Sequence, residues 1–424
     1  ELNEQMQIRR DKLAEYEADG IYPFGQRFVV KDHAKDIKND FLNYEDQPVV
    51  IAGRLMTMRS HGKTAFANIR DLSGDIQVYF RKDVLGEDNY KYVKMLDIGD
   101  IVGIEGHVFK THSGEVTIKV DKLTLLSKAL RPLPEKWHGL KDTELRYRQR
   151  YVDLIVNPEV RDTFVKRSKI VAKIREYMMN DGFMEVETPM MHPIPGGAAA
   201  RPFITHHNAL DIDIYMRIAP ELYLKRLIVG GMERVFEMNR CFRNEGIDNR
   251  HNPEFTTIES YQAYGDVEDA IRLTENLVSY CAQEVLGTQE ITYQGTEINL
   301  TPPWNRITMA EGVKKYTGED FDAVTTVEEA RAIADRLNVE YTNNDGIGKI
   351  LNACFEDYVE ENLIQPTIVY GHPKEISPLA KASRENPLAT ERFEAFIYGR
   401  ELANGFSELN DPIDQKQRFL DQLK

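Results

Sequence analysis

Five short segments of alternating polarity between residues 49 and 121 constrain the fold of this chain more than any other feature. The segments are residues 49–59, 64–70, 75–81, 100–110 and 115–121. Apolar side chains at every second position predict strands with one buried face. Gly62, Gly74 and the sequence HSG at 112–114 predict turns, and residues 83–96 leave room for a helix. Five strands with a helix after the third are typical of an OB-fold β-barrel.

One aromatic residue of this barrel is predicted on a polar face. In the segment 64–70, alanine and isoleucine occupy the apolar positions, whereas Phe66 alternates with polar residues. On the next segment Gln77 shares a face with Tyr79. An exposed aromatic ring among amide and guanidinium groups can stack on a nucleic acid base. Isolated surface phenylalanines are common, however, and the strand pattern leaves both interpretations open.

The length suits two or three domains, and the sequence pattern predicts a linker after the barrel. A chain of 424 residues exceeds one ordinary domain, and 42% hydrophobic residues can form real cores. Residues 128–150 are rich in lysine, arginine and proline and lack a clear period, which is typical of a linker. We therefore expect domains at 1–127 and 151–424. The net charge of −15 argues against non-specific coating of nucleic acid.

The chain is expected to work in the cytoplasm. It contains no run of 18 apolar residues, so no membrane-spanning segment is predicted. Cys241, Cys281 and Cys354 are scattered and form neither a CxxC pair nor a disulfide pattern. Such usage suits a reducing compartment.

The stretch FRNEGIDNRHNPEFT at 242–256 joins two further alternating segments and predicts a hairpin with its turn at 246–252. The shared face would carry Glu237, Asn239, Cys241, Arg243, Phe255, Thr257, Glu259 and Tyr261. An arginine that binds phosphate, an aromatic ring that stacks on a base and His251 in the turn indicate a nucleotide site. A solvated antiparallel sheet could hold the same charges without a ligand. No GxxxxGK[ST] motif is present, so the site is not a P-loop.

A second predicted hairpin lies at 392–411, with its turn near Gly399. Glu394 and Glu401 are expected to face each other across it, and facing carboxylates repel unless a cation such as Mg²⁺ lies between them. Two exposed glutamates paired with arginines are the alternative. Asn404, Phe406 and Glu408 alternate onto one face of the strand, whereas regular alternation would place Glu401 on the other face. A bulge is therefore needed, and we expect it at Gly405.

Four further elements precede the first hairpin. An amphipathic helix with apolar residues from 170 to 178 ends near Gly182, and the strand FMEVET follows it up to Pro189. The small-residue segment PGGAAARPF at 195–203 could close over a ligand or be a plain surface loop. Glu221 begins the next helix, where its charge would complement the helix dipole.

These motifs resemble those of class II aminoacyl-tRNA synthetases. The stretch 242–256 resembles their second signature motif, and the helix and strand ending at Pro189 resemble the first, a dimer-forming element. The sequences RIAPELYLKRL, HNPEFTTIESYQAY and GRELANGFSELND are similar to the bacterial lysyl type, over almost the whole chain. The resemblance implies an α+β fold: an N-terminal OB-fold β-barrel and a catalytic domain built on an antiparallel β-sheet flanked by helices. It also implies ATP-dependent activation of L-lysine, its transfer to the 3′ end of tRNA(Lys), and a homodimer.

The resemblance assigns roles to residues that match the family motifs. The expected catalytic residue is Arg243, at the ATP α-phosphate and the lysine carboxylate. The expected lysine-binding residues are Gly197, Glu221, Glu259, Tyr261, Asn404, Phe406 and Glu408. The expected ATP-binding residues are Arg243, Glu245, His251, Asn252 and Phe255. The expected Mg²⁺ ligands are Glu394 and Glu401. The expected anticodon-binding residues are Arg59, Phe66, Gln77 and Glu115, which favours the base-stacking interpretation of Phe66.

The chemistry of the pocket favours lysine independently of the resemblance. Glu259 and Glu408 are both predicted to point at the substrate side chain. A buried carboxylate without a partner costs several kcal/mol. A long ammonium ligand would supply that partner.

Some alternatives stay open. The family carries a third motif near its C-terminus, and this sequence ends at RFLDQLK before it. We therefore expect the catalytic domain to be incomplete, and a protein ending at Lys424 to aggregate and to be nearly inactive. A paralogue that lysylates a protein would lack the barrel. A non-catalytic lysine or nucleotide sensor would not need both metal carboxylates, and lysine-dependent ATP–pyrophosphate exchange separates it from an enzyme.

Overall fold

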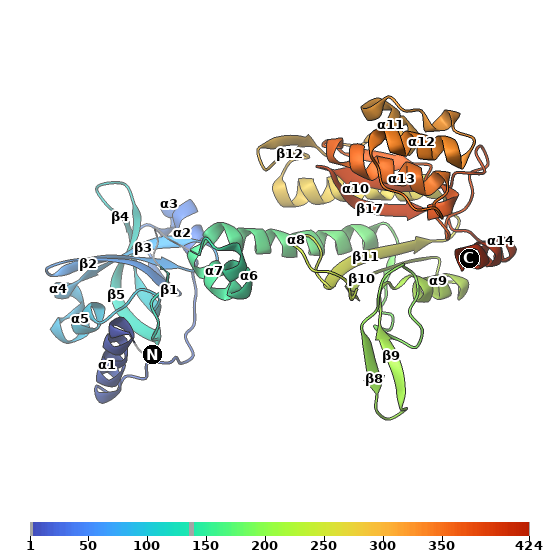
Figure 1. Cartoon of the computed structure of the whole chain (residues 1–424). Helices are drawn as coiled ribbons and strands as arrows, with labels where there is room; N and C mark the ends of the chain where they lie inside the picture. Colours follow the sequence, from blue (N-terminus) through green and yellow to red (C-terminus); the bar gives the residue numbers. More distant parts are fainter. Residues whose placement is uncertain (1–2, 135–139, 424) are drawn as a thin grey trace. The chain divides into compact units, whose positions relative to one another are not determined.

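The computed structural model describes residues 3–134 and 140–423 and divides into two compact units, Glu1–Asp162 and Thr163–Lys424. Figure 1 shows the course of the chain through both. The segment predicted as a linker, 128–150, lies wholly in the first unit, and its residues 135–139 fall outside the described part. It contains the short helix α6 (Thr143–Arg148), which the sequence pattern did not predict.

The first unit contains the predicted five-stranded barrel. Its strands are β1 (Pro48–His61), β2 (Thr64–Arg70), β3 (Asp75–Arg81), β4 (Ile101–Lys110) and β5 (Val116–Ser127). They close in the order β1-β2-β3-β5-β4, with β3 and β5 parallel and the other pairs antiparallel. Ala65, Ala67 and Ile69 are buried inside, as the alternation predicted. The OB-fold barrel is therefore confirmed.

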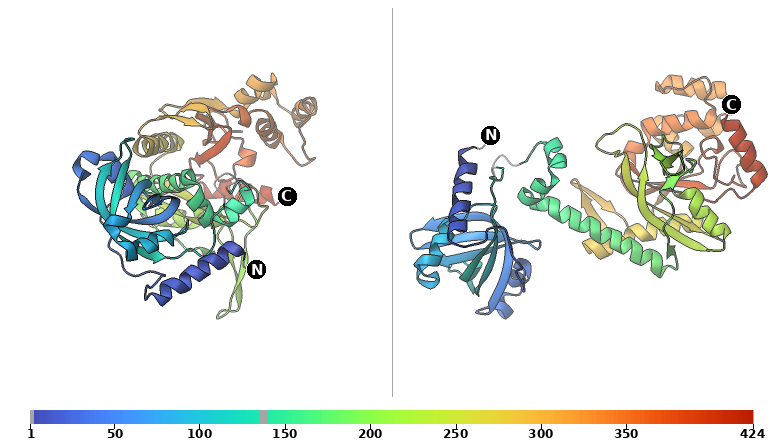
Figure 2. Two further views of the ribbon diagram at one scale, coloured as in Figure 1. Left: turned by 90° about the vertical axis from the view of Figure 1, so that its left-hand side faces the viewer. Right: turned by 90° about the horizontal axis from the view of Figure 1, so that it is seen from below.

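Short helices surround the barrel in the first unit. They are α1 (Glu4–Ala18), α2 (Ala34–Asn39), α3 (Phe41–Tyr44), α4 (Lys82–Leu85), α5 (Glu87–Lys94), α6 and α7 (Arg150–Val156). Helices α4 and α5 occupy the predicted position between the third and fourth strands. Helix α1 lies along the outside of the barrel (Figure 2), where Tyr16 is buried and stacks on Tyr92 of α5.

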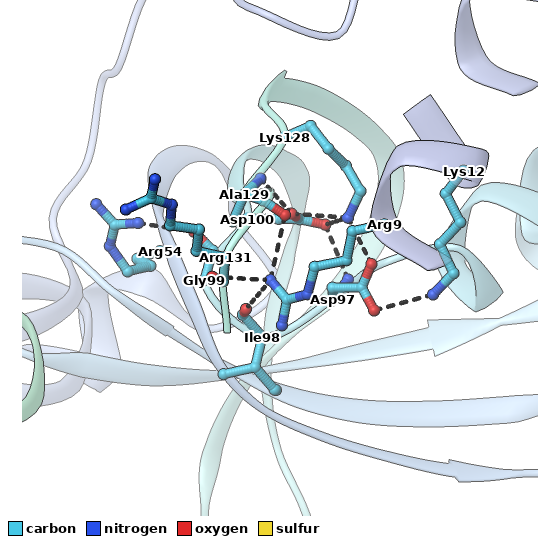
Figure 3. A network of polar contacts seen from close by, with 10 residues as sticks. All are labelled: Arg9, Lys12, Arg54, Asp97, Ile98, Gly99, Asp100, Lys128, Ala129 and Arg131. Atoms are coloured by element: carbon cyan, nitrogen blue, oxygen red, sulfur yellow. Dashed lines mark hydrogen bonds and ion pairs between the residues drawn. The ribbon is translucent and has the colours of Figure 1, made fainter. Parts of the chain in front are cut away.

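A buried network of charges links α1, the start of β4 and the end of β5 (Figure 3). The ammonium group of Lys128 is fully buried and forms ion pairs with Asp97 at 2.6 Å and Asp100 at 3.0 Å. Arg9 of α1 donates hydrogen bonds to the carbonyl oxygens of Ile98, Ala129 and Arg131. Because these partners come from distant parts of the sequence, the network fixes α1 and the chain after β5 to the barrel.

Three small sheets and one larger sheet form the second unit. The strands are β6 (Met184–Glu185), β7 (Met191–His192), β8 (Ile204–His207), β9 (Ile212–Met216), β10 (Arg234–Phe242), β11 (Glu254–Gln262), β12 (Glu290–Tyr293), β13 (Thr296–Asn299), β14 (Asn305–Thr308), β15 (Thr367–Tyr370), β16 (Arg392–Ile397) and β17 (Arg400–Phe406). The sheets have the orders β11-β10-β6, β7-β9-β8, β12-β13 and β14-β15-β16-β17. They are antiparallel except for the pairs β10–β6 and β14–β15.

The helices of the second unit cover its two main sheets. They are α8 (Pro158–Asn180), which begins at the end of the first unit, α9 (Glu221–Val229), α10 (Val267–Leu286), α11 (Met309–Thr317), α12 (Val327–Leu337), α13 (Ile347–Tyr358), α14 (Pro412–Gln422) and three single-turn 3₁₀ helices, Phe321–Ala323, Glu360–Asn362 and Lys374–Ile376. Helix α10 packs on both sheets, because Ile271 joins the core of β15 and β16 while Leu273 and Leu277 pack near Phe236 of β10. Helices α11, α12 and α13 gather beside the larger sheet (Figure 1) and share its core through Val369 and Phe396.

Two features of the second unit match the sequence only in part. The predicted helix before Gly182 is present as α8, and Gly182 follows it with φ +86°. The strand predicted over FMEVET is reduced to the two residues of β6, paired in parallel with β10.

None of the helices in the described part of the chain is both long enough and apolar enough to cross a lipid bilayer.

Candidate active site

The hairpin of β10 and β11 has the register that the alternation predicted. Cys241 lies opposite Phe255, and Glu237 lies opposite Glu259. Opposite residues of an antiparallel pair project to the same face. The odd-numbered residues of both strands therefore form one surface, and the connection 243–253 lies at its end.

Arg243 and Phe255 form the part of the site suited to a nucleotide. The guanidinium carbon of Arg243 lies 5.2 Å from the centre of the Phe255 ring. The Nε atom of Arg243 is buried and has no hydrogen-bond partner among the described residues. A partly buried guanidinium with a buried, unused donor is well placed to bind a carboxylate or a phosphate.

The connection between the two strands holds the other predicted ATP-binding residues. His251 is exposed, and its Nδ1 atom lies 2.9 Å from Asp248, whose carboxylate also accepts the backbone N–H groups of Arg250 and His251. The side chain of Asn252 donates to the carbonyl oxygen of Glu254 at 2.7 Å. The loop is therefore organised by its own side chains, with His251 at an exposed position.

Glu245 connects this loop to the small-residue segment 195–203. Its carboxylate accepts the backbone N–H of Arg201 at 3.4 Å, and the N–H of Asn244 donates to the carbonyl oxygen of Arg201 at 2.7 Å. Gly197 in the same segment has φ +90°, and a Cβ atom there would lie 3.1 Å from the Cβ of Glu221. Glycine thus allows the segment to approach the start of α9.

Three glutamates and a tyrosine from three elements lie close together near Arg243. The carboxylates of Glu221 and Glu408 both contact the ammonium group of Lys225, at 2.7 Å and 2.8 Å. Glu221 is buried, and Glu259 accepts a hydrogen bond from the hydroxyl of Tyr261 at 3.1 Å. We call this group, with Lys225, the carboxylate pocket.

The carboxylate pocket holds more negative than positive charge, because three carboxylates share the single ammonium group of Lys225. Desolvation, together with the charge of Glu221, raises the pKa of Glu259 to about 7. Desolvation also raises the pKa of Glu408, although Lys225 opposes this effect. The pKa of Tyr261 lies well above its usual value because of its burial and the surrounding carboxylates. A cationic ligand would stabilise all three carboxylates in their ionised form.

The hairpin of β16 and β17 carries the remaining residues, and its register corrects the prediction. Glu394 lies opposite Asn404, and Glu401 lies opposite Phe396, so the two glutamates do not face each other directly. The register shifts between Ala395 and Phe396, which makes Leu402 the extra residue of a β-bulge. The bulge moves Glu401 onto the face that carries Glu394 and Asn404.

The predicted position of the bulge was wrong. Gly405 lies in regular register opposite Phe393, and a Cβ atom at Gly405 would lie 2.5 Å from the Phe393 ring. Glycine is needed there because the buried Phe393 ring packs over it, not because the strand bulges.

Glu394 and Glu401 form an acidic pair close to Arg243. Although desolvation raises the pKa of Glu394, His372 and Arg392 hold it below the usual value. Arg392 donates to Glu394 at 2.8 Å and to Asn404 at 2.9 Å. Desolvation and the neighbouring Glu394 raise the pKa of Glu401 to about 7, and Arg243 acts in the opposite direction. The structure therefore brings the two candidate metal ligands to the edge of the nucleotide site.

A metal ion at this acidic pair would need ligands from a substrate. Within residues 3–134 and 140–423 there is no group of three or more His, Cys, Asp or Glu side chains that could hold a metal ion. Mg²⁺ is usually bound by one or two carboxylates together with substrate phosphates. Two glutamates beside an arginine that is predicted to bind phosphate fit this pattern.

The barrel carries a separate candidate surface. Phe66 lies opposite Arg59 on β1 and opposite Tyr79 on β3, and its ring stacks on Tyr79 with centroids 4.5 Å apart. Gln77 projects to the same side, next to Thr117 of β5. Glu115 precedes β5 in the connection that joins it to β4. One outer face of the barrel therefore combines a stacked aromatic pair with polar side chains.

The sequence pattern missed several residues of the catalytic site. Lys225 lies one helical turn after Glu221, and the spacing i, i+4 with opposite charges was a usable signal. Arg392 lies two residues before Glu394 on β16, and this spacing was also a usable signal. His372 had no local signal, because it reaches Glu394 from a different segment. Arg217, which forms a buried ion pair with Glu237 at 3.0 Å, was equally hidden.

Comparisons with known proteins agree with this geometry. The family described as tRNA synthetases class II (D, K and N) matches residues 142–424, and the OB-fold nucleic acid binding domain matches residues 49–126. The lysine–tRNA ligase of Thermoanaerobacter pseudethanolicus is 60% identical over 100% of this chain and 85% of its own length. The lysine–tRNA ligases of Carboxydothermus hydrogenoformans and Bacillus subtilis are 59% and 56% identical over 100% of this chain, and over 87% and 86% of their own lengths.

The OB-fold family matches the barrel of the first unit, the synthetase family matches the whole second unit and the end of the first, and the relatives are similar along the whole chain. The nucleotide site, the acidic pair and the carboxylate pocket all lie within the part matched by the synthetase family. The chain therefore belongs to the class II lysine–tRNA ligases.

Proposed function

We propose that this chain joins L-lysine to ATP to form lysyl-adenylate and transfers the lysyl group to the 3′ end of tRNA(Lys). The observation that carries the proposal is the carboxylate pocket, in which Glu221 and Glu408 already hold the ammonium group of a lysine side chain. A pocket of carboxylates suits a diammonium substrate. Lysine-dependent ATP–pyrophosphate exchange by the full-length protein tests the first step.

The proposed lysine orientation follows from the positions of the pocket residues. Glu221, with Gly197 against it, would receive the α-amino group. Glu408 and Tyr261 would receive the ε-ammonium group, with Glu259 beside them. Asn404 and Phe406, on the strand that leads to Glu408, would line the side of the pocket near the substrate carboxylate.

The ATP would lie on the β10–β11 surface. Phe255 would stack on the adenine, Arg243 would contact the α-phosphate, and His251 would reach the distal phosphates from the exposed loop. Glu245 and Asn252 would hold the two ends of that loop. In this arrangement the lysine carboxylate and the α-phosphate meet at Arg243.

The chemistry needs no protein nucleophile. An oxygen of the lysine carboxylate would attack the α-phosphorus in line, forming the mixed anhydride while the bond to pyrophosphate breaks. A ribose hydroxyl of the tRNA would then attack the lysyl carbonyl, and AMP would leave. Arg243 would stabilise the charge that develops on the phosphate, and the pocket would hold the reacting atoms together.

We propose Glu394 and Glu401 as ligands of Mg²⁺. Their mutual repulsion, expressed in the raised pKa of Glu401, is the reason that a cation fits between them. When bound, Mg²⁺ would neutralise charge on the phosphates. Arg392 would keep Glu394 oriented, since it also binds Ile376 and Ser377.

The anticodon of the tRNA is proposed to bind the barrel face that carries Phe66. Arg59, Gln77 and Glu115 would supply polar contacts around it. A homodimer through α8 and β6 is also proposed, supported by the exposed side chains of Met179 and Met184. Three free, buried cysteines are compatible with a cytoplasmic location.

Replacing Glu408 with glutamine should raise the KM for lysine by about 10- to 100-fold. The change removes a charge-assisted bond worth roughly 1.5–3 kcal/mol. The KM for ATP should stay nearly constant, because Glu408 is not placed at the nucleotide. Steady-state exchange kinetics measure both constants.

Glu385→Gln is the matched control, since this exposed glutamate lies in a loop of the same unit. It should leave both constants unchanged. An unchanged lysine KM in Glu408→Gln would contradict the assignment of the pocket.

Replacing Phe66 with alanine should weaken transfer to tRNA while exchange persists. A stacked base contributes roughly 1–3 kcal/mol, so the KM for tRNA should rise about 5- to 150-fold. Aminoacylation and pyrophosphate exchange are measured on the same preparation. Leu72→Ala is the control, because Leu72 is exposed in the turn before β3. If exchange falls as far as transfer, Phe66 has a structural role.

A further inference from the structure

Lys225 is the positively charged residue of the carboxylate pocket and has no role in the proposed binding of the substrate. It lies one turn after Glu221 on α9, and its side chain is 27% exposed. Its ammonium group contacts Glu221 on its own helix and Glu408 after β17. Lys225 therefore joins the carboxylates that are proposed to bind the two ends of the substrate.

The charges of the pocket do not balance without a ligand. Glu221, Glu259 and Glu408 carry three negative charges when ionised, and Lys225 carries one positive charge. Arg217 is already paired with Glu237, and Arg243 is proposed to bind the carboxylate and phosphate groups of the substrates. Tyr261 is neutral. The ionised pocket is thus left with two uncompensated negative charges, equal to the two ammonium groups of lysine.

We propose that Lys225 is a specificity-determining residue: it neutralises one of the three pocket carboxylates and so matches the pocket to a substrate with two ammonium groups. This inference rests on the proposed lysine pocket. A single ammonium group that contacts both Glu221 and Glu408 also keeps these carboxylates close together. The two ammonium groups of the substrate stand at opposite ends of an extended chain, so one of these contacts must open when lysine binds.

The number of protons released when lysine binds is a suitable measurement, because a purely structural role of Lys225 would not change it. With Lys225 present, desolvation and the charge of Glu221 raise the pKa of Glu259 to about 7, and Lys225 opposes the rise in the pKa of Glu408 that desolvation causes. Lys225 keeps its charge, because the two glutamates outweigh its desolvation and raise its pKa. Without Lys225, the ammonium group that opposes the raised pKa of Glu408 is lost, and Glu408 should take up a proton in the empty pocket.

The sign of the expected pH dependence follows from this proton. Lysine binds the ionised carboxylates, so a proton held by the empty pocket must leave on binding. Affinity is therefore lost as pH falls through the raised pKa of the carboxylate. In Lys225→Met the loss of lysine affinity should begin at a higher pH than in the unmodified protein. Binding of lysine should also release about one more proton.

The test compares Lys225→Met, Lys225→Arg and the unmodified full-length protein. At pH 7 the lysine KM of Lys225→Met should be roughly tenfold higher than that of the unmodified protein. The difference between the two KM values should shrink as pH rises towards about 8.5, because each pH unit changes the binding of one proton by a factor of about ten. The ATP KM should not change. Calorimetry of lysine binding in two buffers with different ionisation enthalpies counts the released protons. Lys225→Arg, which keeps the charge, should release as many protons as the unmodified protein.

Arg226→Met is the matched control, because Arg226 is the next residue of α9 and lies over the Tyr223 ring outside the pocket. It should behave as the unmodified protein does. An unchanged proton count and lysine KM in Lys225→Met would overturn the inference. If Glu408→Gln also leaves the lysine KM unchanged, the proposed pocket itself fails. If Glu408→Gln raises it, only the role of Lys225 fails.

Discussion

Replacing Arg243 with glutamine should lower the kcat of lysine-dependent pyrophosphate exchange by about 10²–10³-fold. Removal of one preorganised donor at a developing negative charge typically has an effect of this size. Arg243 is proposed to touch both reacting groups, and its Nε atom is buried without a hydrogen-bond partner in the described structure. The substitution leaves a neutral amide too short to reach the same position. Exchange kinetics at saturating lysine and ATP measure the effect.

Arg240→Gln separates this effect from a general loss of charge on β10. Arg240 lies on the same strand but projects to the opposite face, where it pairs with Glu254 at 2.9 Å. That pair is exposed, and such pairs contribute about 0–1 kcal/mol. Arg240→Gln should therefore retain nearly full activity. A kcat of Arg243→Gln within tenfold of the unmodified protein would contradict the proposed role.

The first hairpin of the catalytic unit could be predicted in detail because it is regular. Alternation continues over all nine residues of β10 and of β11, so the face of each side chain followed from its parity. The barrel was predictable for the same reason. In these segments, each local preference agrees with the final fold.

The hairpin of β16 and β17 shows what the alternation of side chains along a strand cannot predict. Two residues of opposite parity can share a face only if one residue is extra, but the sequence does not say which one. Gly405 seemed suited to a bulge, whereas Leu402 is the extra residue and Gly405 makes room for Phe393. The choice depends on the packing of the Phe393 ring, which only the folded sheet shows.

Charges that meet across the fold were the least predictable part of the site. Arg392 reaches Glu394 and the segment near Ser377, and Lys225 reaches Glu408 from another helix. The contact of Lys225 with Glu408 joins segments far apart in the sequence, and so does that of Arg392 with Ser377. The pairs Glu221–Lys225 and Arg392–Glu394 are local, with spacings of four and two residues that could have indicated their contacts.

Replacing Lys128 with methionine should destabilise the barrel by about 3–5 kcal/mol. Removal of one partner from a buried ion pair leaves an uncompensated charge, and the cost is usually of this size. Lys128 and Asp100 are both fully buried, and Asp100 would keep only its contacts with backbone N–H groups of Asp97 and Ala129. Because the chain has two units, unfolding need not be a single transition. Hydrogen exchange of the β4 and β5 amides measures the barrel separately.

Lys12→Met is the matched control for this network. Lys12 also pairs with Asp97, at 2.9 Å, but this pair is partly exposed and should contribute about 0–1 kcal/mol. The amides of the catalytic unit should exchange as before in both variants. Equal protection of the barrel in Lys128→Met and Lys12→Met would mean that the buried ammonium group does not stabilise the fold.

The pH dependence of barrel stability in these variants checks independently that the loss of stability in Lys128→Met is electrostatic. Although desolvation raises the pKa of Asp97, Lys128 and Lys12 hold it below its usual value. A carboxylate with a lowered pKa stabilises the fold above its unfolded-state pKa and loses that contribution as pH falls through its folded-state pKa. Lys128→Met lacks most of this contribution at neutral pH. The difference in barrel stability should therefore stay constant down to about pH 4 and shrink as the pH falls further, whereas a cost due only to lost packing would stay constant throughout.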